Sequence, residues 1–479
     1  MLWTPRPEKI IKKNYRIFER KKKRALLEKN TLKKIKLIEK AAYWAAYNTC
    51  GVYASPELEA ALCQIAQTSP TPKDITPKPN SRLHVMTTSY KTGGHTRVVD
   101  QWIANKPEGQ HHDVIILNQL EGHLPEYLVD TIKMAGGTLT LAVPSDDKIA
   151  DALKLRKLAC KYEKVILHHH MEDATPTLAF GTETFKRPVI TFDHAEHMFW
   201  LGASVTDVSA VLSPDTIPFS MERRGVQALF LPIPTKVHPL HPKTEARARL
   251  NIAQGKKVLL SIGGDFRFKP SKEYNFIRFC EELFKTVPHL MVVIVGVTPT
   301  NKYWQNLKNR HGDNLLLTGL VKDKNLYYDY IAAADVYVES LPIGGETTSL
   351  EVAVTNTPTL VLEKPMRRSS AWAGYPATDI ADLTEKTVAY LKGKTGPDTA
   401  FAASIMSMHS PLAFTKHILE IESQAPQTHS LHSIPEEKVR ISEYDLFLIK
   451  YYGGIRTNRL RKFFRRISKK LGLVKSSKA

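Results

Sequence analysis

The stretch DVYVESLPIGGETTSLEVAV, residues 335–354, decides the fold class of this chain. Its first six residues alternate in character and are rich in β-branched and aromatic side chains, so they predict a strand. Thr347, Thr348 and Ser349 then suit the first turn of a helix that continues through LEVAV. Glycines between a strand and a helix let a ligand approach the backbone, and the unpaired N–H groups of a helix start favour an anion. The stretch therefore predicts either an anion-binding βα unit or an ordinary, well-capped βα loop.

The same alternation of strand and helix continues on both sides of this stretch. The strand-like segments before it are LHVMTTS, HDVIILN, TLTLAV, KVILHHH, PVITFDH, AVLS and ALFLP, and those around it are KVLLSIGG, LMVVIVG, NLLLTG, DVYVES and PTLVLE. Strands that alternate with helical patterns predict parallel, doubly wound sheets. We therefore expect an α/β protein with two Rossmann-like domains that face a cleft. Ligands should bind beyond the carboxyl ends of the strands.

Two proline-rich segments, 68–81 and 231–242, mark the expected domain boundaries. The predicted division is a basic helical extension (1–67), a linker (68–81), a first Rossmann-like domain (82–235), a second one (236–400), C-terminal helices (401–454) and a basic amphipathic tail (455–479).

The net charge of +20 is concentrated at the two ends of the chain. Residues 1–40 hold 15 Lys and Arg against 4 Glu, and residues 451–479 hold 10 Lys and Arg with no acid. The long middle part is left with a net charge of about −1, so it is not built as a surface for polyanions.

Cysteine usage and hydropathy indicate the cellular compartment in which the protein works. The 4 cysteines are scattered without a CxxC pair, which argues against a disulfide framework and a cysteine zinc site. The N-terminus lacks the apolar region of a secretory signal peptide, and no apolar run approaches the length of a membrane span. We expect a protein of the reducing cytoplasm.

Candidate binding residues follow several predicted strands. In the first half, TSYKTGGHTRVV places Gly93, Gly94 and His95 at a glycine turn that opens a helix. In the second half, SIGGDFRFKP places Arg267 and Lys269 just after a strand. A glycine turn, basic side chains and a helix start are together suited to a diphosphate.

These pieces, in their order and spacing, resemble a GT-B glycosyltransferase, the type with two Rossmann domains. The second half is most similar to glycosyltransferase family 4. The resemblance covers roughly residues 83–395 and rests on TSYKTGGHTRVV, SIGGDFRFKP, VVIVG, LLLTGLVKDKNLYYDYIAAADVYVESLP and GGETTSLEVAVTNTPTLV. It implies that the C-terminal domain binds a sugar nucleotide and that the N-terminal domain binds the acceptor. It also implies hexosyl transfer, with a retaining outcome.

The resemblance assigns roles to individual residues and shows where this chain departs from the family. Glu351 matches the glutamate that holds the ribose hydroxyls, whereas Ile343 stands where the family has its first glutamate, and Glu346 is the candidate substitute. Lys269 matches the diphosphate-binding lysine. Gly264 occupies the position of the arginine, for which Arg267 is the nearby stand-in. With these cations and the helix start at 347–349, no metal ion or other cofactor is required.

The histidines after two strands invite a catalytic or a metal-binding interpretation. His194 could be a packed histidine, or it could contact the donor sugar or acceptor hydroxyl, with Asp193 as its orienting group or as the base. The run His168–His170 is a poor zinc site, because successive strand residues point to opposite faces. The loop of Gly93, Gly94 and His95 could be a packing turn; we predict that it lies under the sugar or acceptor.

The C-terminal tail has the pattern of an interfacial helix. Apolar residues, among them Phe463 and Phe464, recur at helical spacing, and basic residues such as Arg465 and Arg466 fill the other side. Such a helix is attracted to anionic lipid. The alternative is a helix packed on the N-terminal domain with a solvated basic face.

Together these features predict a sugar-nucleotide-dependent glycosyltransferase of polysaccharide biosynthesis. It would sit peripherally on the inner face of the plasma membrane and act on a lipid-linked saccharide or surface polysaccharide. The alternatives are another GT-B-type enzyme, such as a protein glycosyltransferase or a sugar-nucleotide epimerase, and a non-enzymatic nucleic-acid binder that uses its basic tails. The near-neutral middle of the chain disfavours nucleic acid as a partner.

Overall fold

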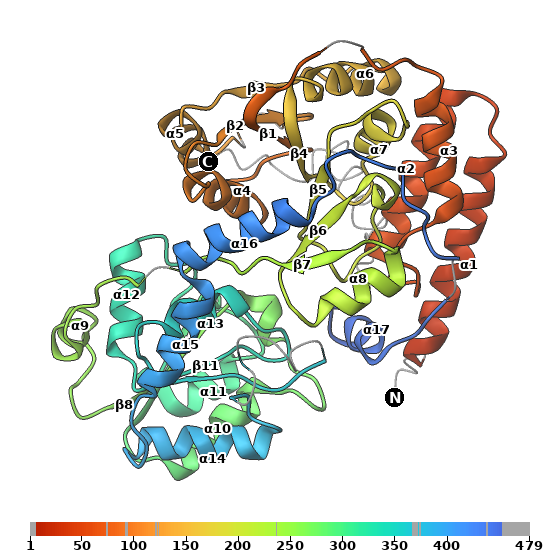
Figure 1. Ribbon diagram of the computed structural model, residues 1–479. Helices are drawn as coiled ribbons and strands as arrows, with labels where there is room; N and C mark the ends of the chain where they lie inside the picture. Colours follow the sequence, from red (N-terminus) through yellow and green to blue (C-terminus); the bar gives the residue numbers. More distant parts are fainter. Residues whose placement is uncertain are drawn as a thin grey trace, which may run out of the picture.

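The computed structural model describes residues 6–452, apart from 73–74, 92–93, 120–121, 123, 236, 366–371, 373–374 and 437–438. Within these residues, two parallel sheets form the framework (Figure 1). The first sheet has seven strands in the order β3-β2-β1-β4-β5-β6-β7. They are β1 (Lys78–Met86), β2 (His111–Ile116), β3 (Leu139–Leu141), β4 (Tyr162–His168), β5 (Val189–Asp193), β6 (Val208–Val211) and β7 (Ala228–Phe230).

Helices cover both faces of the first sheet. They are α4 (Gly94–Ala104), α5 (Glu126–Met134), α6 (Lys148–Ala159), α7 (Thr175–Phe180) and α8 (Thr216–Arg224), with a 3-10 turn at Ala203–Val205. The order in which strands are added to the sheet reverses between β1 and β4, so the loops after these two strands flank a crevice where ligands typically bind in such sheets.

The second sheet has five strands within the described residues, in the order β10-β9-β8-β11-β12. They are β8 (Lys257–Ile262), β9 (Leu290–Val295), β10 (Leu315–Leu317), β11 (Val336–Val338) and β12 (Thr359–Leu360). Its helices are α9 (Lys243–Arg249), α10 (Phe276–Thr286), α11 (Gln305–His311), α12 (Lys324–Ala333), α13 (Glu346–Ala353) and α14 (Ile380–Leu391), with 3-10 turns at Asp265–Phe268 and Gly312–Asn314. Here the crevice lies between the loops that follow β8 and β11.

Apolar periodicity explains how these helices attach to the sheets. In α10, for example, Phe276, Phe279, Cys280 and Leu283 are buried at the i, i+3, i+4, i+7 spacing of one helix face. All twelve predicted strands are present, and the prediction of two parallel α/β domains is confirmed.

The N-terminal extension is part of the first domain's core. It forms α1 (Pro7–Leu26), α2 (Thr31–Tyr47) and α3 (Pro56–Gln67). Phe18 and Ile38 are fully buried in the same apolar cluster as Val165 of β4. Lys22 is also buried and pairs with Glu57 at 3.1 Å. Most other basic residues of this segment are exposed, on helices whose inner face completes a core.

The C-terminal segments connect the two domains. They are α15 (Thr399–His409), α16 (Pro411–Gln424), α17 (Glu443–Phe447) and a π-helical turn at Leu448–Tyr452. Phe401 of α15 packs in a cluster of the second domain, whereas Phe414 and Ile418 of α16 pack with Trp102 in the first. The chain thus returns to the first domain at α16, which lies between the two sheets in Figure 1.

No helix in the described part of the chain is both long enough and apolar enough to span a bilayer.

Candidate functional site

The loop between β11 and α13 is built over a buried carboxylate. Glu339 follows β11 and is 1% exposed. Its Oε1 accepts hydrogen bonds from the backbone N–H of Gly345 (3.0 Å) and the hydroxyl of Ser349 (3.2 Å), and its Oε2 pairs with Lys364 Nζ at 3.1 Å. A Cβ on Gly344 would lie 2.5 Å from Glu339 Oε1. Glycine is therefore required here by the protein's own carboxylate, and Ser349 turns inward instead of facing a ligand.

Arg267 lies across the start of α13. Its guanidinium Nη1 is 3.5 Å from where a Cβ on Gly345 would be, and its Cδ is 2.8 Å from where a Cβ on Gly263 would be. Among the described residues its guanidinium makes no hydrogen bond or ion pair, although it lies 5.3 Å from the centre of the Phe266 ring. A cation beside the positive end of a helix can hold an anion.

The other residues predicted to bind the donor near this point are exposed or half-buried. Lys269 is exposed just after Arg267, and Glu346 and Thr347 are exposed in the first turn of α13, with Thr348 half-buried beside them. Gly345 precedes this helix as its N-cap.

Glu351, the predicted ribose ligand, is half-buried and already has two hydroxyl partners. Tyr328 donates to its Oε1 at 2.5 Å and Tyr327 to its Oε2 at 3.1 Å. Burial and the Glu351 carboxylate both raise the pKa of each phenol well above its usual value. The two tyrosines therefore stay protonated and hold the carboxylate in place, and each carboxylate oxygen keeps a second lone pair for a ligand hydroxyl.

A cavity of about 270 Å³ lies between the two domains, at the loop after β11. From the first domain it is lined by Glu196, Ser213 and Thr216, and from the second by Pro342, Ile343, Gly344, Glu346, Lys364 and Pro365, with Tyr444 and Phe447 of α17 closing one side. The cavity therefore joins the carboxyl ends of both sheets, as a cleft between two Rossmann-like domains should.

Glu196 lines this cavity, and the sequence placed it after a strand without assigning it a role. Its Oε1 accepts hydrogen bonds from the backbone N–H groups of Leu212 and Ser213. Burial, together with the negative charges of Asp193 and Glu346, raises the pKa of Glu196 to about 8. A carboxyl group that exchanges its proton near neutral pH is suited to general acid–base chemistry. The only sequence signal was its position just after a strand.

Asp193 and His194, the predicted catalytic pair, have different surroundings. Asp193 is buried in an ion pair with Arg224 (3.2 Å) and accepts from the indole N–H of Trp200 at 3.2 Å. The imidazole of His194 lies against that of His95, with 4.1 Å between ring centres. Burial lowers the pKa of His194 well below its usual value, so the ring is neutral at neutral pH. The catalytic role of Asp193 stays a prediction, and its buried ion pair does not favour it.

The glycine loop of the first domain leads directly to this pair of histidines. Gly94 begins α4, and a Cβ on it would meet no atom within 4 Å, so space rather than packing surrounds it. Burial lowers the pKa of His95 to about 3. Gly93 lies outside the described residues.

The three consecutive histidines after β4 do not meet at one point. His168 Nε2 bonds with His84 at 2.9 Å, His169 Nε2 with the carbonyl of Leu201 at 2.6 Å, and His170 lies against Tyr90. Among the described residues, no cluster of histidine, cysteine or acidic side chains is arranged to hold a metal ion.

His168 belongs instead to a buried row that crosses three strands. His84 Nε2 bonds with His112 Nδ1 at 2.8 Å, and His112 Nε2 with the amide oxygen of Gln110 at 2.8 Å. Gln110 in turn donates to Glu422 of α16 at 2.8 Å. Burial and the Arg82 guanidinium lower the pKa of His84 to about 3, so the row is neutral and each ring has a fixed tautomer.

The predicted membrane residues Phe463, Phe464, Arg465 and Arg466 lie outside the described part of the chain.

Comparison with known proteins identifies the fold. No family of known sequences and no curated protein matches the chain. Several solved structures, however, are similar to the chain. A glycosyltransferase from Rickettsia africae has a TM-score of 0.54 at 12% identity, over 72% of this chain and 99% of that one. The lipopolysaccharide outer core galactosyltransferase WaaB has a TM-score of 0.53 at 12% identity, over 72% and 99%. The Anabaena protein HepE, solved with UDP, has a TM-score of 0.53 at 12% identity, over 71% and 99%.

The topology and these matches agree on one architecture. Both sheets are parallel, the strand order in each reverses at a central strand pair, and helix α16 returns to the first domain. The chain therefore has the GT-B fold, the two-Rossmann-domain fold of glycosyltransferases.

Proposed function

We propose that this protein is a glycosyltransferase that takes a sugar from a nucleotide donor and passes it to a glycan acceptor. The observation that carries the proposal is the position of Arg267. Its guanidinium lies at the start of α13 without a side-chain partner among the described residues. A diphosphate leaving group develops negative charge as the sugar–phosphate bond breaks, and a preorganised cation beside a helix start stabilises that charge.

The residues around Arg267 fit the rest of a nucleotide sugar. Lys269 adds a second cation, and Thr347 and Thr348 present hydroxyl groups in the same helical turn. Glu351, one turn further on, accepts the ribose hydroxyls beside its two tyrosines. The sugar then extends into the cavity between the domains. No metal ion is needed for this arrangement, so activity should survive EDTA.

In this proposal, residues of the first domain transfer the proton of the acceptor hydroxyl. Glu196 faces the loop of Gly344 and Glu346 across the cavity. Burial and the nearby negative charges raise its pKa to about 8, close to neutrality. His194 is the neutral neighbour that hydrogen-bonds a sugar or acceptor hydroxyl. A retaining outcome, as in the family that the sequence resembles, is part of this proposal.

The acceptor we propose is a lipid-linked saccharide or a growing surface polysaccharide at the inner face of the plasma membrane. Two features support this choice. The chain has basic residues concentrated at both ends, which suit an anionic lipid surface. One structural neighbour, WaaB, is a galactosyltransferase of the lipopolysaccharide outer core.

The experiment that tests the proposal measures donor binding and turnover together. The full-length protein is incubated with UDP and with a set of nucleotide sugars, and stabilisation is followed by thermal shift. Nucleotide sugars that stabilise it are then assayed for sugar release, with and without EDTA. Arg267→Ala should weaken nucleotide binding about 10-fold or more, because a charge-assisted bond is lost. Arg278→Ala, on the exposed side of α10, is the matched control.

Three results would contradict the proposal. One is the absence of stabilisation by every nucleotide tested. Another is an equal effect of Arg267→Ala and its control. The third is conversion of the donor sugar to its epimer without release, which would indicate an epimerase with the same fold.

A further inference from the structure

After α16 the chain runs along the first domain and then reaches the second domain again. Arg440 donates its backbone N–H to the carbonyl of Gly51 in the first domain at 3.1 Å. Residues 442–451, here called the strap, follow it and contain α17 and most of the π-helical turn. Tyr444 and Phe447 of the strap line the interdomain cavity. One side of this cavity is therefore formed by a segment that belongs to neither sheet.

The strap is attached to the first domain by buried contacts. Asp445 is fully buried, accepts a hydrogen bond from the hydroxyl of Tyr53 and pairs with Arg223 at 3.9 Å. Leu448 and Ile449 are only 4% and 6% exposed, and the π-helical turn to which they belong lies against α1. Separating this end of the strap from the first domain would leave a buried carboxylate without its partners and expose apolar side chains, both of which are costly.

The attachment of the strap to the second domain is exposed to solvent. Lys450 and Tyr451 both contact the carboxylate of Glu273, which lies shortly before α10. The side chains of Glu273 and Lys450 are 53% and 45% exposed. Tyr274 adds ring contacts, with its centre 5.1 Å from that of Tyr451 and 6.4 Å from that of Phe447. A solvent-exposed ion pair contributes only about 0–1 kcal/mol, so this is the weaker of the two attachments.

The covalent crossings between the domains lie next to each other and away from the strap. Thr235, in the first crossing, donates its backbone N–H to the carbonyl of His409, in the second, at 2.6 Å. The imidazole of His409 donates to the carbonyl of Ile233 at 3.0 Å. In Figure 1, α17 lies well to the right of the junction between α15 and α16. Two domains joined by chain at one place can rotate about it, and the strap opposes that rotation at another place.

The segment that holds Glu273 also carries the cations assigned to the donor. Arg267 and Lys269 precede Glu273 in the connection between β8 and α10. Between them and α10 the segment forms a closed turn, in which the backbone N–H of Ser271 donates to the carbonyl of Tyr274 at 3.0 Å. An anion bound by the cations and the strap bound at Glu273 therefore act on the same short piece of chain.

We propose that the strap is a latch. Its contact with Glu273 holds the two domains together over the interdomain cavity, and release of that contact opens the cavity on the side of the strap. Because the buried end of the strap stays on the first domain, Tyr444 and Phe447 then move away from the second-domain lining. The latch itself does not depend on an enzymatic activity. That a nucleotide sugar enters and a product leaves through this opening rests on the proposed function.

The test measures the distance between the domains in the full-length protein, by electron paramagnetic resonance of two spin labels. Met221→Cys on α8 and Tyr303→Cys in the second domain provide the labelling positions, which are 52% and 43% exposed. The four native cysteines are buried, so the labels react at the introduced positions.

Three variants of the labelled protein alter the latch. Glu273→Lys and Lys450→Glu each replace the ion pair by two like charges, and the double variant restores a pair of opposite charges. Glu282→Lys is the matched control, since it makes the same change in charge but breaks an exposed ion pair with Lys285 within α10, at 2.9 Å.

We expect each single variant to raise the population of longer interdomain distances about 3-fold or more, because like charges replace an ion pair. The double variant should return this population to that of the protein with the native latch, and the control should leave it unchanged. Unchanged distances in the single variants, a double variant that stays open, or the same opening in the control would overturn the inference.

Thermal stabilisation by UDP is measured on the same samples. If UDP stabilises the protein with the native latch but the distances do not respond to the variants, only the latch is wrong. If the distances respond as expected and UDP stabilises none of the samples, the latch stands and the proposed function is wrong.

Discussion

Glu196 and Glu351 are two carboxylates of the candidate site that have different surroundings. Glu196 is half-buried close to other acids, which favours its protonated form. Glu351 is held by two tyrosine hydroxyls, which stabilise it as an acceptor. One is therefore suited to moving a proton and the other to holding a ligand.

The raised pKa of Glu196 predicts a pH dependence of stability. Because folding shifts this pKa from its usual 4.5 to about 8, the carboxyl's contribution is fully present below about pH 4.5 and is lost as the pH rises through 8. Glu196→Gln should remove that loss. Between pH 5 and 9 the unaltered protein should lose at least about 1 kcal/mol more stability than the variant, measured by chemical denaturation. Glu183→Gln, at an exposed position, is the control. Parallel curves for Glu196→Gln and the unaltered protein would contradict the assignment.

Glu351→Ala should remove most of the thermal shift that UDP produces. A hydrogen bond to a charged acceptor contributes roughly 1.5–3 kcal/mol, so nucleotide binding should weaken about 10-fold or more. Tyr328→Phe tests the alternative that Glu351 only anchors the tyrosines. It removes the 2.5 Å bond but leaves the carboxylate, and should keep most of the shift. An undiminished UDP shift in Glu351→Ala, or an equal loss in both variants, would remove Glu351 from the ribose site.

Among the elements, the loop before α13 is the one whose shape depends most on a single residue. A methyl group at position 344 would clash with the buried carboxylate of Glu339, whereas one at Gly94 would meet open space. Gly344→Ala should therefore destabilise the protein by about 1–3 kcal/mol, the usual cost of overpacking, while Gly94→Ala should have little effect. Urea denaturation of the two variants checks this. Equal stability would mean that Glu339 can move aside.

The histidine row of β1, β2 and β4 predicts acid sensitivity. The pKa values of His84, His112 and His168 are all lowered, chiefly by burial. Their contribution is therefore present above the unfolded value near 6.5 and is lost as the pH falls below it. Each histidine costs up to about 1.4 kcal/mol of stability per pH unit in that window. His112→Gln should flatten the fall in stability between pH 6.5 and 5. A profile identical to that of the unaltered protein would contradict it.

At the scale of the whole molecule, we expect the basic residues at the two ends of the chain to have different roles. Those of α1 and α2 belong to helices whose inner faces are core, whereas the C-terminal pattern from 455 onward has the features of an interfacial helix. Each basic residue near an anionic membrane contributes on the order of 1 kcal/mol, within a Debye length.

Truncation after Gly454 should therefore abolish binding to anionic vesicles and leave the melting temperature and UDP binding unchanged. Phe463→Ser together with Phe464→Ser should weaken vesicle binding even at low salt, since charge alone does not anchor a helix. Sedimentation with vesicles at two salt concentrations measures both. Unfolding of the truncated protein, or loss of UDP binding, would show instead that the tail is part of the fold.

Much of the architecture could be predicted because local patterns carry it. All twelve strands and the helix that begins at Glu346 follow from alternation and from first-turn residues, which depend only on neighbours in the chain. The alternation of side chains along a strand also predicted that successive histidines point apart, and His168 and His169 do have separate partners.

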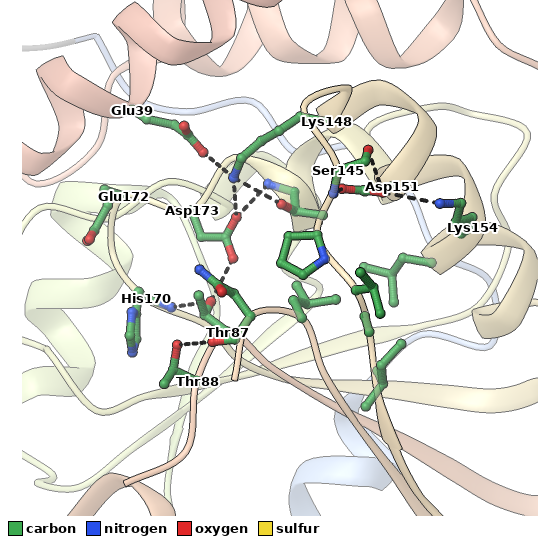
Figure 2. Close-up of a pocket in the computed structure, with 18 of the residues that line it drawn as sticks. Glu39, Thr87, Thr88, Ser145, Lys148, Asp151, Lys154, His170, Glu172 and Asp173 are labelled. Atoms are coloured by element: carbon green, nitrogen blue, oxygen red, sulfur yellow. Dashed lines mark hydrogen bonds and ion pairs between the residues drawn. The ribbon is translucent and has the colours of Figure 1, made fainter. Parts of the chain in front are cut away.

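The site was only partly predictable, because its partners are distant in sequence. Glu339 and Lys364 are 25 positions apart, and Glu196 meets the loop of Gly344 and Glu346 from another domain. Asp193 was expected to transfer a proton, but it forms an ion pair with Arg224 of the next strand–helix unit. A pocket of about 550 Å³ at the carboxyl ends of β1 to β4 joins Glu39, in a segment predicted as an extension, to loops of the first sheet (Figure 2). Sequence pattern established which elements form and in what order, since those depend on local preferences. Which side chains share a cavity, and what each does to the ionisation of the next, depended on how those elements pack.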